Sequence, residues 1–192
     1  MSSRFDTLAS QAPDVVAAWR GISEGAPISV RREVRRRAGE GSTERIVPQL
    51  AAVAAALASV AEALPERAFD MPGGEGDWNV AQAIGHTASA RAGLVTAASL
   101  AASARWPADA PVVVPGVPGA TGATREDLLR RLAASQRIVE RAARSIAGHE
   151  LDACPLDHPL VGRMRCGEWL LFSAVHDLMH LEQLENLEGS LA

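Results

Sequence analysis

Apolar residues recur along this chain at the three- and four-residue spacing of amphipathic helices, in four long segments. This period predicts helices over residues 47–64, 79–105, 124–147 and 167–187. No stretch of note alternates apolar and polar residues with the period of a strand, and the valines at 112–114 are too isolated to build a sheet. The pattern therefore predicts an all-α protein, a four-helix bundle.

Local stop and start signals agree with these boundaries. Asn79 is placed to cap the second helix, and Thr124 with Asp127 forms the capping pattern that opens the third. Gly148 is expected to end the third helix, and Pro48 is acceptable in the opening turn of the first. The first three predicted helices thus each have at least one local signal near an end.

Residues 1–41 lack this long periodicity. We expect an irregular leader with two short helical pieces, 13–20 and 30–37, followed by a single bundle domain over residues 42–192. This N-terminal helical extension would pack across the bundle or contact a second subunit in a homodimer. The only dense basic run, Arg31–Arg37, is either a patch that binds phosphates or acids, or a solvated helix face paired with nearby carboxylates.

Two connections are long. Residues 106–123 are rich in Pro, Gly, Ala and Val, and an unstructured link of this length is typical of a lid or a binding loop. Residues 154–162 are expected to be a second irregular segment before the last helix.

Composition narrows the class of protein. A hydrophobic content of 47% in 192 residues indicates one globular domain, and a net charge of −4 gives no support to nucleic-acid binding. The chain has two cysteines, no signal peptide, and an apolar stretch over 50–64 that is too short to span a membrane. We expect a soluble cytoplasmic protein whose partner is a small molecule.

Three of the five histidines carry the chemistry. His176 and His180 stand one helical turn apart on an apolar stripe, so both imidazoles can reach one metal ion. His86, in another helical segment, is the obvious third ligand. The alternative for each is an ordinary buried histidine, but two adjacent buried imidazoles need a partner for their nitrogens.

Two sequence motifs resemble those of the DinB/YfiT-like superfamily. Trp78-Asn79, followed by His86, is similar to the W-S/T opening of the family's second helix. The stretch from His158-Pro to the H-x-x-x-H-x-x-Q of His176, His180 and Gln183 is similar to its other signature. The resemblance covers the chain from about residue 43 to its end.

This resemblance implies a bundle of up-down-down-up topology with a divalent ion near one end, held by His86, His176 and His180. Family members with known reactions include bacillithiol transferases and mycothiol-dependent maleylpyruvate isomerases. It therefore implies a metal-dependent thiol S-transferase that uses a low-molecular-weight thiol. Metal-dependent hydrolysis, or a bundle that binds metal or a partner without catalysis, remain the alternatives. Zinc or nickel is the metal that we expect first.

Other residues near the site have two interpretations. Gln183 can orient a ligand, or be an ordinary polar bundle residue. Asp177 gives His-Asp-x-x-His, one methylene short of the zincin motif in which the acid is a general base. Arg91, Arg163 and Arg165 can hold an anionic substrate, although a solvated surface is the ordinary place for each.

Overall fold

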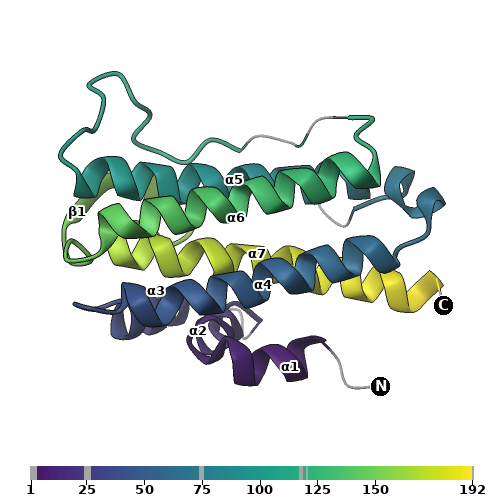
Figure 1. The fold of residues 1–192 in the computed structure, drawn as a ribbon, viewed down its shortest axis with the longest axis horizontal. Helices are drawn as coiled ribbons and strands as arrows, with labels where there is room; N and C mark the ends of the chain where they lie inside the picture. Colours follow the sequence, from purple (N-terminus) through teal and green to yellow (C-terminus); the bar gives the residue numbers. More distant parts are fainter. Residues whose placement is uncertain (1–3, 24–26, 74–75, 117–118, 120, 192) are drawn as a thin grey trace.

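The computed structural model describes residues 4–23, 27–73, 76–116, 119 and 121–191, and most of these are helical. The elements are α1 Arg4–Gln11, α2 Pro13–Ser23, α3 Pro27–Arg37, α4 Thr43–Ala63, the 3-10 helix η1 Glu66–Asp70, α5 Val80–Ala102, α6 Arg125–Ile146, β1 Ala153–His158, β2 Gly162–Arg165 and α7 Cys166–Leu191. The four long helices α4, α5, α6 and α7 form the predicted bundle (Figure 1).

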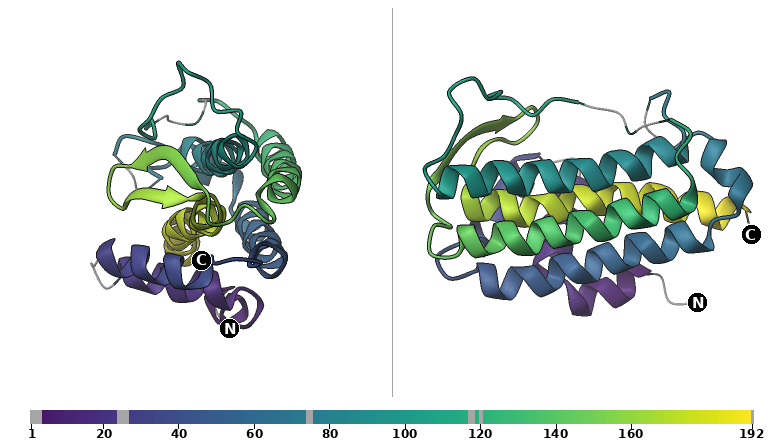
Figure 2. Two further views of the ribbon diagram at one scale, coloured as in Figure 1. Left: turned by 90° about the vertical axis from the view of Figure 1, so that its left-hand side faces the viewer. Right: turned by 45° about the horizontal axis from the view of Figure 1, so that its top comes forward.

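The bundle has up-down-down-up topology. Helices α4 and α7 run in one direction and α5 and α6 in the other (Figure 1). Because α5 and α6 are parallel neighbours, the chain must return along the whole bundle between them. The described residues of this crossover are 103–116, 119 and 121–124. The crossover lies over α5, on the side of the bundle opposite the first three helices (Figure 2).

The predicted caps of α5 and α6 are confirmed. The side chain of Asn79 accepts the Gln82 backbone N–H at 2.8 Å, and Gln82 reaches back to the Asn79 N–H at 3.1 Å. Thr124 and Asp127 make the same reciprocal pair at the start of α6. After α6, Gly148 adopts a φ of +80°, a left-handed conformation that favours glycine and lets the helix end there.

Helix α4 begins four residues before the predicted start, so Pro48 lies inside the helix and not in its opening turn. The reason is a distant side chain. The carboxylate of Glu150, itself buried, accepts the Thr43 hydroxyl at 2.8 Å and the Thr43 N–H at 3.4 Å. An acid from the turn after α6 thus caps α4, and no signal next to residue 43 reveals it.

The prediction of an irregular segment over 154–162 is wrong. Strands β1 and β2 form an antiparallel hairpin, and Gly162, at a φ of +70°, follows its turn. The valines at 112–114 also pair with β1: Val114 donates its N–H to the Asp157 carbonyl, and the Asp157 N–H donates to Val112. This pairing connects the crossover to the hairpin.

Residues 4–23 and 27–41 are more helical than predicted, since α1 is new and α2 extends to Ser23. Leu8, Val15 and Val34 are buried in the same core as the bundle residues. The basic run follows the second of its two interpretations, because Arg32, Arg35, Arg36 and Arg37 pair with carboxylates. Arg35, for example, lies 2.9 Å from the buried Glu168 of α7. The leader therefore packs across α4 and α7.

Among the described residues, α4 is the one helix long and apolar enough to cross a membrane. Ile46, Leu50 and Leu57 on this helix are buried in the core. A core helix of a bundle passes the same test of length and composition, so this feature is weak evidence for a membrane span.

Deleting residues 1–41 tests the division between leader and bundle. The four long helices and the three histidines remain, so we expect the truncated chain to stay helical. Loss of the leader exposes apolar surface on α4 and α7 and removes the Arg35–Glu168 pair, so its melting temperature should fall. Circular dichroism against temperature measures both. A transition that is no longer cooperative would show that the leader belongs to the folding unit.

Candidate metal centre

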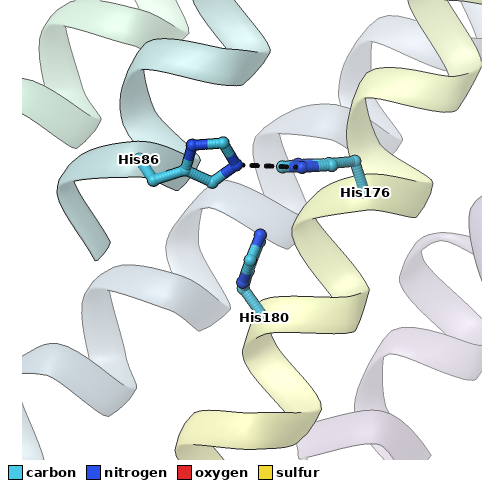
Figure 3. Close-up of side chains that lie close together, drawn as sticks. All are labelled: His86, His176 and His180. Carbon is cyan, nitrogen blue, oxygen red and sulfur yellow. Dashed lines mark hydrogen bonds between the residues drawn. The ribbon is translucent and has the colours of Figure 1, made fainter. Parts of the chain in front are cut away.

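Three imidazoles converge between α5 and α7, as Figure 3 shows. The Nε2 atoms of His86 and His176 lie 3.3 Å apart, and one ring nitrogen from each of the three histidines falls within 4.8 Å of the others. The His180 ring centroid is 5.2 Å from that of His86 and 4.7 Å from that of His176. The structure therefore brings the three predicted ligands together.

His86 is held by its neighbours on two sides. It lies in the second turn of α5, and the Trp78 ring packs against it with 4.7 Å between centroids. Gly119 of the crossover lies close to the backbone of α5. A Cβ at this position would overlap the Gln82 carbonyl oxygen and lie 2.7 Å from the backbone nitrogen of His86. A glycine is needed at this close approach.

Gln183 is a positioning partner of His180. Its Oε1 lies 3.0 Å from Nδ1 of His180, one turn away on the same helix. An amide oxygen can only accept, so Nδ1 carries the proton and Nε2 keeps its lone pair. A hydrogen bond of this kind sets the tautomer and orientation of a metal-binding histidine.

The surroundings of His176 favour its neutral form. Burial lowers its pKa well below the usual value, and the neighbouring His180, His86 and His158 act in the same direction. The Nδ1 atom of His176 is buried and has no hydrogen-bond partner among the described residues. Neutral imidazole is the form that binds a metal, so these surroundings suit a ligand.

The donor set fits a divalent transition metal. Three neutral nitrogen donors from two rigid helices are the usual protein share of a catalytic site, which keeps one position open for water or substrate. Two facing Nε2 atoms repel through their lone pairs unless a proton or a cation lies between them. Zinc and nickel both suit imidazole ligands.

A cavity of about 580 Å³ opens beside the triad, with His86 and His176 in its wall. Helix α5 forms one side of it, the crossover from Trp106 to Pro115 another, and β1 contributes Leu156. The long link predicted to be a binding loop thus covers a cavity that reaches two of the three histidines.

His158 also lines the cavity. The sequence had indicated only that it begins the second family motif. Its ring lies 4.8 Å from Phe172 between centroids, and burial lowers its pKa below the usual value. Its Nδ1 accepts the Leu160 N–H at 3.2 Å, so the neutral ring carries its proton on Nε2. A histidine of this kind, beside the triad but outside it, can donate a hydrogen bond into the cavity.

Arg91 and Asp177 form an ion pair in the interior of the bundle. Both side chains are fully buried, with Nε of Arg91 2.9 Å from Oδ2 of Asp177. Burial raises the pKa of Asp177 to about 7, although the guanidinium acts in the opposite direction. A solvated surface was the wrong expectation for Arg91. Neither residue lines the cavity, so the two are not placed there to hold a substrate or act as a base.

The other two arginines are exposed, as expected. Arg163 pairs with Asp157 across the hairpin at 2.8 Å, and Arg165 lies at the exposed end of β2. Neither lines the cavity.

The fold and the triad define a class: a four-helix bundle with three histidines clustered beside an open cavity. The family model described as the DinB superfamily matches residues 49–184, which include all three histidines and Gln183. The chain belongs to the DinB superfamily. No curated protein and no solved structure matches it.

The buried ion pair makes a prediction about stability. Asp177→Asn leaves the Arg91 guanidinium buried without a counter-ion, so we expect a loss of about 3–5 kcal/mol in the free energy of unfolding. The double variant Arg91→Met/Asp177→Leu should recover most of that loss, because neither of these two positions then buries a charge. Urea unfolding at about pH 8, above the pKa of Asp177, measures both.

The exposed pair of the hairpin supplies the matched control for this measurement. Asp157→Asn removes the same charge from a solvated pair and should change stability by less than about 1 kcal/mol. If Asp157→Asn and Asp177→Asn lowered the free energy of unfolding equally, burial would not be the reason for the cost of breaking the Arg91–Asp177 pair.

Proposed function

We propose that this chain is a divalent-metal-dependent enzyme, a thiol S-transferase that acts with a low-molecular-weight thiol. The observation that carries the proposal is the meeting of three imidazoles, His86, His176 and His180, at the wall of an open cavity. Membership of the DinB superfamily supports it. A small-molecule substrate, a cytoplasmic location, and the absence of nucleic-acid and membrane partners belong to the same proposal.

Each residue of the site has a role in this chemistry. The three histidines would hold the ion. A bound ion lowers the pKa of a coordinated thiol, so that the thiol is a nucleophilic thiolate at neutral pH. Gln183 keeps the proton of His180 on Nδ1. Trp78 and Gly119 hold His86 in place. The apolar wall excludes water, and His158 offers a hydrogen-bond donor to the leaving oxygen or carbonyl of the electrophile.

Removing single ligands tests the metal. The His86→Ala and His180→Ala variants should each lose the ion, because two imidazoles leave it with too few donors. Elemental analysis of protein purified without a nickel column measures the metal-to-protein ratio. His149→Ala, on the exposed surface, and His158→Ala, in the cavity wall, are matched controls that should keep the ion.

The same assay follows pH. Free imidazole titrates near a pKa of about 6.5, and a protonated ring cannot bind metal, so occupancy should fall as the pH drops through about 6. The lowered pKa of His176 keeps that one ligand neutral further into acid. If His86→Ala still bound stoichiometric metal, or if the metal occupancy of the wild type were unchanged at about pH 4, the three histidines would not be the metal ligands.

Cobalt tests the thiol. A thiolate bound to Co(II) adds an intense charge-transfer absorption that water or a carboxylate does not supply. Mycothiol, bacillithiol, coenzyme A and glutathione are titrated into the cobalt form of the wild type and of His176→Ala. We expect one of them to produce the band in the wild type alone. If no thiol produces the band, but the protein hydrolyses an activated ester only when metal is bound, the protein is a hydrolase. If neither the band nor ester hydrolysis is seen, the bundle is not catalytic.

A further inference from the structure

We propose that the cavity is a channel for an uncharged, elongated apolar group of the substrate, an alkyl, acyl or aryl chain. The reacting end of this chain lies at His86 and His176. The assignment of that end rests on the proposed function, whereas the chemistry of the channel depends only on its wall.

The wall carries no formal charge among the described residues. Its side chains are mostly Ala, Leu, Val, Pro and Trp, and the polar ones are limited to Ser89, Thr96, His86, His158 and His176. A charged group placed among them would lose its hydration and gain no counter-ion. An apolar group loses nothing of this kind and gains from leaving water.

The channel is long and its roof is stiff. Its wall follows α5 from His86 to Leu100, and a helix rises about 1.5 Å per residue, which gives a length of about 21 Å. The roof contains Pro107, Pro111 and Pro115, whose fixed φ angles limit its conformations. The Val114–Asp157 hydrogen bond at 2.9 Å ties it to the hairpin. A preformed channel of this shape suits an extended chain.

The thiol is a poor occupant of this channel. Low-molecular-weight thiols of cells carry carboxylates, phosphates or sugar hydroxyls, and the wall offers them few partners. Only the sulfur end of such a molecule would reach the triad. The apolar channel is therefore assigned to the electrophile, which makes the proposed transferase one for hydrophobic acceptors.

Gly93 offers a way to shorten the channel. It lies in α5 midway between His86 and Leu100, and a Cβ built on it meets no atom within 4 Å. Gly93→Leu should therefore fill the middle of the channel without a clash, and it removes a glycine from a helix interior, which favours folding. Gly189→Leu on α7 is the matched control, because that glycine is exposed, is equally open and lies outside the cavity.

The test uses neutral probes whose hydroxyl group is only a weak metal ligand. Straight-chain alcohols from butanol to decanol are titrated calorimetrically into the wild type, into His86→Ala and into both glycine variants. Affinity should rise about three- to fourfold with each methylene in the wild type and in His86→Ala. Gly93→Leu should bind butanol normally and lose the gain for octanol and decanol, while Gly189→Leu should match the wild type.

The outcomes separate the channel from the catalytic proposal. An affinity that does not depend on chain length, or amino alcohols that bind as well as alcohols of equal length, would overturn the channel. So would a Gly93→Leu variant that binds decanol like the wild type. If the chain-length series holds while no metal or thiol binds, the channel stands and the transferase proposal fails alone.

Discussion

The interaction on which the rest of the structure depends is the buried contact of one guanidinium with three other helices. Arg91 on α5 lies 2.9 Å from Asp177 on α7, and it also donates to the Leu50 carbonyl of α4 and to Gln136 of α6. A charge in an apolar core is tolerated only when its partners surround it, so the pair sets how all four helices meet. Asp177 directly follows His176, and the same contact therefore fixes the turn that presents this ligand.

Topology explains why the site has a cavity beside it. Parallel neighbours α5 and α6 require a connection that runs the length of the bundle, and this crossover covers the side of α5 that the described helices leave uncovered. Gly119 brings its far end against the backbone of His86. The segment that the fold needs for connectivity thus also forms one wall of the cavity and supports one ligand.

Features that depend on local spacing could be predicted from the sequence. The caps at Asn79 and Thr124 and the pair His176/His180 are such features. His86 was predicted as the third ligand because it lies in another helical segment, and the resemblance implied the same set of three. The start of α4 could not be predicted, because Glu150 lies more than one hundred residues away. The same reason hid the burial of Arg91, whose partners come from three other helices, and the pairing of the valines at 112–114 with β1.

The crossover tolerates substitutions that the helices of the bundle do not. Residues 106–116 have no helix of their own, and several of them are exposed, so substitutions there disturb few core contacts. The histidines and the ion pair, in contrast, lie on helices whose interior neighbours restrict every change. Descendants of this chain can therefore acquire new acceptor molecules through changes in one connection, while the metal centre and the bundle are inherited intact.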